Sequence, residues 1–174
     1  VIYYDLGLTR SQQMFSDLNR HAVRPTKSLD ILYDNRDAFS ILIKDCIREI
    51  PVFNGSVESE KSKISNRSSA LFTLSGLYHA TKILFSGYPS VLPEEARRIV
   101  VDFWSAVCDN MALWEAAKKR DISPEEFRRD YICAHTIALK AIGEVGKLLL
   151  SCEPDHLKWT SRMSFLNEIN WDKT

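Results

Sequence analysis

Apolar residues recur three and four positions apart along most of this chain, and this spacing constrains the fold more than any other feature. Between residues 36 and 49, for example, Phe39, Ile43 and Cys46 fall on one helical face, because residues three or four positions apart share such a face. Six further segments show the same spacing: 9–22, 28–33, 69–85, 93–120, 123–152 and 154–169. We therefore predict a mainly α, bundle-like fold of about seven helices, with residues 1–174 forming a single domain.

The first of these segments carries a start signal and an end signal. Thr9 stands three residues before Gln12, a capping-box pattern in which side chains satisfy exposed backbone N–H groups. The apolar residues that follow at helical spacing, and that we expect to form a buried face, are Met14, Phe15, Leu18 and Ala22. Pro25 then ends the helix, since proline has no backbone N–H and restricts the residue before it.

Two segments lack the helical pattern. Residues 1–4 are β-branched and aromatic, which predicts the one short strand of the chain. We expect residues 1–5 to be the end of a sheet that belongs to a missing N-terminal part, so that the chain is a fragment of a longer protein. Residues 54–69 are rich in Ser, Gly, Asn and charged side chains and predict a mobile loop or a short β-hairpin.

Charge and hydropathy narrow the classes of function. The chain holds 23 basic and 23 acidic residues, so its formal net charge is zero, whereas nonspecific nucleic-acid binders are usually strongly basic. A local basic patch can nevertheless attract phosphates. No apolar run approaches the roughly 20 residues of a membrane span, and no signal peptide opens the chain. We therefore expect a cytoplasmic protein without a membrane partner.

The sequence gives little support for catalysis or metal binding. The four cysteines and four histidines do not occur at the spacings of known metal sites. Phosphate-binding glycine loops and the nucleophile-elbow motif do not occur either. Paired glutamates at 94–95 and 125–126 stand at expected helix starts, where the helix dipole already explains them. We predict no catalytic residue, no metal site and no cofactor, and we consider an enzyme the less favoured interpretation.

Two basic clusters are the best candidates for a binding site. The first consists of Asn19, Arg20, His21, Arg24, Lys27 and Ser28, and the second is centred on Lys61, Lys63 and Arg67 among serines and asparagines. Cationic side chains mixed with Ser and Asn are typical of contacts to DNA phosphates, and a few such residues can dominate affinity despite zero net charge. On composition alone, each cluster is more often an ordinary solvated surface than a binding site.

Four blocks of the chain resemble the DndB family, whose members regulate DNA phosphorothioate (sulfur) modification. The longest block is VIYYDLGLTRSQQMFSDLNRHAVRPTKSLDILYDNRDAFS, at the start of the chain. RSSALFTLSGLYHATKILF and YICAHTIALKAIGEVGKLL are similar to later blocks of that family, and LNEINWDKT is similar to its tryptophan-containing C-terminal block. Together these blocks span most of the chain.

The resemblance implies a DNA-binding negative transcriptional regulator of the sulfur-modification genes, with double-stranded promoter DNA as its partner. The family belongs to a wider group that is named for a DGQHR motif and related to ParB-like proteins. That motif would precede Val1, so no function that it carries can be assigned to residues of this chain. Two alternatives remain: a ParB-like enzyme that processes nucleotides or DNA, and a module that binds other sulfur-modification proteins through the Trp-bearing C-terminal helices. A homo-oligomer is compatible with each of these.

The resemblance also bears on individual residues. Asn19 and Arg20 follow the end of the first predicted helix and are the favoured polar contacts to DNA, with either one able to read a base edge. Arg36 has two interpretations: it contacts DNA, or it pairs with Asp34 or Asp37 and braces the turn between two helices.

Overall fold

The computed structural model describes residues 8–20, 25–86, 93–153 and 155–173. The α-helices in these ranges are α1 (Leu8–Arg20), α2 (Lys27–Tyr33), α3 (Ala38–Glu49), α4 (Leu74–Leu84), α5 (Pro93–Asp109), α6 (Ala112–Lys119), α7 (Pro124–Asp130), α8 (Thr136–Cys152) and α9 (Trp159–Arg162). Two short strands, β1 (Val57–Glu58) and β2 (Phe72–Thr73), pair in parallel. The mainly α class is confirmed, whereas the predicted number of about seven helices is too low for the described ranges.

The predicted helix at 93–120 is divided into α5 and α6 because the chain bends at Asn110. The buried Asn110 amide donates to the carbonyl of Ala106, 2.9 Å away, and to that of Thr160, 2.7 Å away. Its oxygen accepts a hydrogen bond from Asn167 at 2.9 Å. The side chain therefore joins the end of α5 to the C-terminal segment, and the helix does not continue through it.

The predicted helix at 123–152 is also divided, because its central backbone bonds to the C-terminal residues. The N–H of Ile132 donates to the Trp171 carbonyl at 2.8 Å, and Tyr131 forms an antiparallel bridge with Asp172. Between α7 and α8 the chain forms one 3-10 turn at Ile132–Ala134. These partners lie about 40 residues apart in the sequence, so local spacing could not reveal the break.

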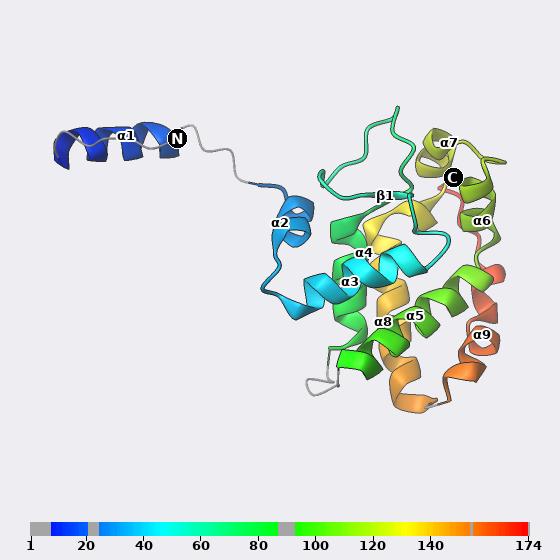
Figure 1. Ribbon diagram of the computed structural model, residues 1–174. Coiled ribbons are helices and arrows are strands. Elements are labelled where there is room, and N and C mark those ends of the chain that lie inside the picture. The colour runs from blue at the N-terminus through cyan, green and yellow to red at the C-terminus, as the bar shows by residue number, and fades with distance from the viewer. Residues whose placement is uncertain (1–7, 21–24, 87–92, 154, 174) are drawn as a thin grey trace.

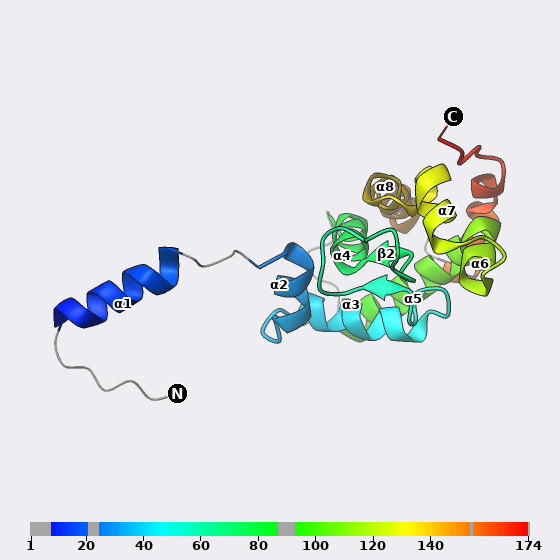
Figure 2. The ribbon, with the colours of Figure 1, turned by 90° about the horizontal axis from the view of Figure 1, so that it is seen from above.

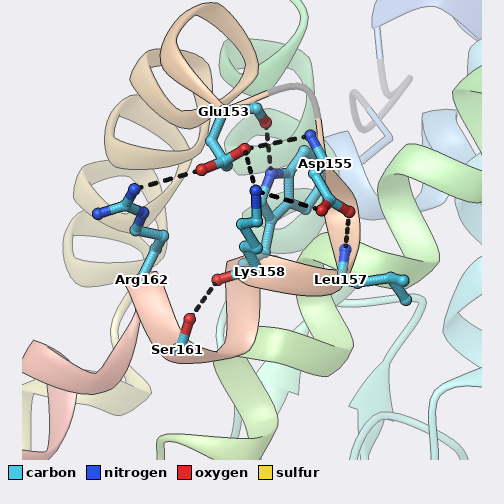
Figure 3. A network of polar contacts seen from close by, with 7 residues as sticks. Glu153, Asp155, Leu157, Lys158, Ser161 and Arg162 are labelled. Carbon is cyan, nitrogen blue, oxygen red and sulfur yellow. Dashed lines mark hydrogen bonds and ion pairs between the residues drawn. The ribbon is translucent and has the colours of Figure 1, made fainter.

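Short turns replace the last predicted helix. The 3-10 turn His156–Lys158, helix α9 and the 3-10 turn Ser164–Asn167 follow one another. Glu153, just past the end of α8, anchors them: its carboxylate accepts from Arg162 at 3.3 Å, and its carbonyl accepts from the Trp159 indole at 2.9 Å (Figure 3). Lys158 lies near the same carboxylate, at 3.8 Å.

The core is aromatic and is centred on the packing of α4, α5 and α8. Its largest fully buried side chains include Trp104, Trp114, Trp159, Phe72 and Phe103. Helices α4 and α8 run in parallel, since Gly76 lies near Thr136 and Gly143 lies near Ala80. Figure 1 shows these two helices crossing the middle of the molecule, with α5 and α9 beside them. None of the described helices combines the length and apolar character that a membrane span requires.

Side chains cap four of the helix starts in the structure. Thr26, Asp37, Thr73 and Ser123 each accept a hydrogen bond from an N–H in the first turn of the helix that follows. These are the residue types that favour helix N-termini, because their side-chain oxygens satisfy backbone donors that the helix leaves free. Ser123 is the predicted start of its helix, whereas α4 begins at Leu74 and not at 69 as predicted, because residues 72 and 73 form β2.

Helix α1 forms as predicted, but its apolar residues do not enter the core. In both views α1 lies apart from the other helices (Figures 1 and 2). Met14 is 38% exposed and Phe15 is 72% exposed, so the predicted burial of these two residues is wrong. Spacing specifies which residues share a helical face, but it cannot specify whether another element covers that face. The side chain of Leu18, all of Ala22 and the predicted strand at residues 1–4 lie outside what the structure describes.

The segment predicted as a loop or hairpin is an irregular loop. It runs from 59 to 71 between β1 and β2, whose pairing places Val57 opposite Phe72 and Glu58 opposite Thr73. Because this pairing is parallel, the hairpin alternative is wrong. The loop, called the 59–71 loop below, passes between the start of α2 and α7 (Figure 1).

Candidate nucleic-acid interface

Of the first predicted cluster, the structure describes the side chains of Lys27 and Ser28 alone. The backbone of Asn19 and Arg20 ends α1, while His21 and Arg24 lie outside the described residues. Lys27 is the exposed first residue of α2. Ser28 is fully buried, and its hydroxyl lies 3.1 Å from that of Ser75. Ser28 therefore joins α2 to α4 and is not available at the surface, so its prediction as a DNA contact is wrong.

The turn around Arg36 is braced, but by a different residue. One carboxylate oxygen of Asp34 accepts from the backbone N–H of Arg36 at 2.9 Å and from that of Asp37 at 3.1 Å. Among the described residues, the exposed Arg36 guanidinium forms no ion pair with either carboxylate. The predicted brace by the Arg36 side chain is wrong, and its guanidinium remains at the surface.

The second predicted cluster lies on the 59–71 loop. Lys61, Lys63 and Arg67 are all exposed. Thr26 donates a hydrogen bond from its hydroxyl to the carbonyl of Glu60, and the Glu58 carboxylate accepts from the N–H of Lys61 at 3.2 Å. The start of the loop is therefore fixed beside the N-terminus of α2, which carries Lys27.

Arginines from α7 and from the end of α6 hold the rest of the loop. The Arg128 guanidinium donates to the carbonyls of Ser65 at 3.1 Å, Asn66 at 3.0 Å and Ala70. Arg120 donates to the carbonyl of Ser69 at 3.2 Å. Sequence reasoning did not find these anchors. Every residue has a backbone carbonyl, so the residue types do not reveal which carbonyls accept from an arginine.

A cleft of about 550 Å³ lies between the 59–71 loop, the end of α7 and the start of α8. Its charged lining consists of Lys63, Glu125, Arg128 and Arg129, and its polar lining includes Ser62, Asn66, Thr73, His135 and Thr136. Helix α8 begins here without a side-chain cap, so its positive dipole end adds to the cations. The cleft can accept an anionic group.

The cations of the cleft differ in how far they are neutralised. Arg129 makes two hydrogen bonds of 2.7 Å to Asp130, and this pairing lowers the pKa of the Asp130 carboxyl. Arg128 donates to backbone carbonyls only, as far as the described residues show, and burial lowers its pKa. An arginine stays charged under such a shift. Lys63 also has no ion-pair partner in the described ranges. Lys63 and Arg128 are therefore the lining cations without an ion-pair partner, and the nearby Glu125 carboxylate opposes part of the charge of Arg128.

A second group of cations surrounds His79 on α4. Burial lowers the pKa of the half-buried His79 imidazole, and Lys140, Lys27 and Lys82 lower it further through their charges. The three lysines come from α8, α2 and α4 and are exposed. Only Lys27 was predicted, because positions 27, 82 and 140 meet through the packing of helices distant in sequence. We call Lys27, His79, Lys82 and Lys140 the lysine cluster.

Among the described residues, neither a metal site nor a reactive buried thiol finds support. No three of their His, Cys, Asp or Glu side chains lie close enough together to hold a metal ion. Burial raises the pKa of the Cys46 thiol to about 11 and that of the Cys133 thiol to about 12. A thiol with so high a pKa is a poor nucleophile at neutral pH. The basic surfaces remain the feature that points to a ligand.

Comparison with known proteins gives one match. The family model for DndB, described as DNA-sulfur modification-associated, matches residues 1–174, the whole chain. No curated protein and no solved structure matches the chain.

Proposed function

This chain belongs to the DndB family of DNA-sulfur modification-associated proteins, and from this premise we propose that it is a DNA-binding negative regulator of the sulfur-modification genes. Membership associates the chain with DNA sulfur modification. We propose in addition that the chain binds double-stranded DNA in the promoter region of those genes and lowers their transcription.

The anchored 59–71 loop carries the proposal. Lys61, Lys63 and Arg67 project from a loop that hydrogen bonds hold at both ends. Cations presented on a fixed backbone lose little freedom on binding, so each contact to a phosphate contributes more. The cleft beside Lys63 adds the N-terminus of α8, and helix N-termini bind phosphate groups readily.

The lysine cluster extends the same interaction to α2, α4 and α8. Thr26 connects the two regions, since it precedes Lys27 and donates to the carbonyl of Glu60 in the loop. DNA that contacts both regions would meet more cations than a single loop supplies. Asn19, Arg20, His21, Arg24 and Arg36 stay predictions within this proposal.

The C-terminal tryptophans give less support to the alternative of a protein-interaction module. Trp159 is fully buried, and the Trp171 indole donates to the carbonyl of Leu166 at 3.0 Å. Both side chains therefore stabilise the C-terminal segment. No described feature favours the ParB-like enzyme, and we propose no second function.

The proposal predicts a specific change in salt dependence. In the full-length protein, Lys63→Ala with Arg67→Ala should weaken binding to a labelled promoter duplex. It should also reduce the slope of log K against log salt by about 0.9 for each lost contact. Fluorescence anisotropy over a salt series measures both quantities.

The matched control is Arg48→Ala with Lys119→Ala, since each of these exposed cations is paired with a carboxylate of its own helix. The control should keep the wild-type affinity and slope. If the Lys63 and Arg67 variant behaves like the control, the loop does not bind DNA phosphates and the proposal fails.

A further inference from the structure

Arg128 occupies an unusual position for a cation beside a basic cleft. Its guanidinium is half-buried under the 59–71 loop and donates to the carbonyls of Ser65, Asn66 and Ala70. Its side-chain donors are therefore directed at the protein backbone. Arg67, a proposed phosphate contact, lies between these acceptors, and Lys63 lies two residues before the first of them.

Apart from bonds at its start, where Glu58 accepts from the N–H groups of Glu60 and Lys61 and Thr26 donates to the Glu60 carbonyl, the loop has few other described hydrogen bonds to define its shape. Within the described chain, its backbone–backbone hydrogen bonds run from the Ser68 N–H to the Ser65 carbonyl at 3.0 Å and from the Leu71 N–H to the Ser56 carbonyl at 2.7 Å. Arg120 contributes one bond to Ser69. Arg128 thus supplies more bonds to the loop backbone than any other described side chain.

The chemistry of the contact requires arginine. A guanidinium presents five N–H donors in a rigid planar fork, so one side chain can reach carbonyls that are separated along the chain. Lysine carries the same charge, but it has a compact ammonium group on a flexible stem and cannot reproduce this geometry. A single substitution, Arg128→Lys, therefore keeps the positive charge and removes the hydrogen bonds that hold the loop.

We infer that Arg128 is a positioning residue for DNA binding: it fixes residues 65–70 so that Lys63 and Arg67 face the DNA phosphates. This inference rests on the proposed function, which it deepens by naming a residue that acts through the loop without contacting DNA. Without Arg128 the loop would have to be ordered at the moment of binding, and ordering the backbone of even one residue corresponds to about a tenfold change in affinity.

The loop itself provides a direct measurement of its order. Trypsin cleaves after Lys61, Lys63 and Arg67, and a protease cuts a loop faster when the loop opens more often. In the full-length protein without DNA, Arg128→Ala and Arg128→Lys should both accelerate cleavage at these sites by about tenfold. Arg129→Ala is the matched control, because it removes the neighbouring arginine, which pairs with Asp130 and does not hold the loop. Its cleavage rate should equal that of the wild type.

The same variants are then tested on the labelled promoter duplex. Arg128→Lys should bind about tenfold more weakly than the wild type with an unchanged salt slope, because the charge is kept and the phosphate contacts remain. If Arg128→Lys shows the wild-type cleavage rate and the wild-type affinity, the charge of residue 128 alone matters and the inference is overturned. An unchanged cleavage rate in both Arg128 variants overturns it as well, and so does faster cleavage with unchanged affinity.

The two proposals fail in different ways. Failure of the unmutated protein to bind the promoter duplex rejects the proposed function, and with it the role of Arg128 in DNA binding. The cleavage rates decide independently whether Arg128 holds the loop.

Discussion

At the scale of single residues, Asp37 shows how one carboxylate can join two helices. It caps α3 by accepting from the N–H groups of Phe39 at 3.1 Å and Ser40 at 3.2 Å. It also accepts from the Tyr78 hydroxyl of α4 at 3.0 Å. Burial alone would raise the pKa of Asp37, but hydrogen bonds from Ser40, Phe39 and Tyr78 outweigh burial and lower it. The ionised form is therefore favoured in the folded protein.

This pKa shift predicts how stability depends on pH. Since the folded pKa of Asp37 is below its unfolded value, its contribution is present above about pH 4 and is lost as the pH falls through the folded pKa. Asp37→Asn should lower the free energy of unfolding by about 1 kcal/mol at pH 7, and the difference from wild type should shrink towards pH 3. Urea unfolding at several pH values measures this. A difference that stays constant with pH would exclude the ionised carboxylate as its source, and Tyr78→Phe should reproduce part of the loss.

Residue type carries more information about a helix cap than about a partner distant in sequence. Asp and Thr before an apolar helical pattern indicate a cap locally, and Asp37 and Thr73 act as caps. Ser28 and Arg36 were assigned to a binding surface because their types are common there. The buried bond of Ser28 to Ser75 crosses 47 residues, and local sequence carries no signal for such a partner.

At the scale of elements, the parallel packing of α4 on α8 depends on small residues. A Cβ on Gly143 would meet the backbone of Ala80, with the carbonyl carbon at 3.1 Å and the carbonyl oxygen closer still. Because that obstacle is backbone and not a flexible side chain, the two helices would have to separate. Helical spacing predicted both helices but not their close approach, since a glycine within a helix has several possible causes.

Gly143→Ala should therefore destabilise the protein, even though alanine favours helices more than glycine does. Overpacking typically costs about 1–3 kcal/mol, against a gain of about 1 kcal/mol from helix propensity, so we expect a net loss and a lower Tm. Glu144→Ala, at the exposed neighbouring position, is the control and should change stability little. Thermal unfolding followed by circular dichroism compares the two, and a Tm of Gly143→Ala at or above the wild-type value would contradict the close packing.

At the scale of the whole molecule, a chain of zero net charge divides its cations into three groups. Some pair with carboxylates, as Arg97 does with Glu49 at 2.7 Å. Others hold backbone carbonyls, as Arg128 does. A third group, which includes Lys63, has no ion-pair partner among the described residues. Composition could locate Lys61, Lys63 and Arg67, which are close in sequence. It could not locate Lys82 and Lys140, which join Lys27 only through folding.

The lysine cluster gives the proposed DNA complex a pH dependence. In the free protein, burial and the charges of Lys140, Lys27 and Lys82 lower the pKa of His79. Phosphates placed over this cluster would oppose the charges of the lysines and raise that pKa, so the complex would take up a proton. Affinity for DNA should therefore increase as the pH falls from about 8 to about 6, by up to about tenfold per pH unit for one proton.

His79→Gln should reduce this dependence, because glutamine is polar but does not titrate. His156→Gln is the control: His156 bonds to Asp102 of α5 at 2.9 Å, lies in the 3-10 turn that follows α8, and is not part of the lysine cluster. Anisotropy titrations of the promoter duplex at constant ionic strength across this pH range compare the three proteins. If wild type and His79→Gln show the same change of affinity with pH, DNA does not cover the lysine cluster. The proposed interface would then be limited to the 59–71 loop and its cleft.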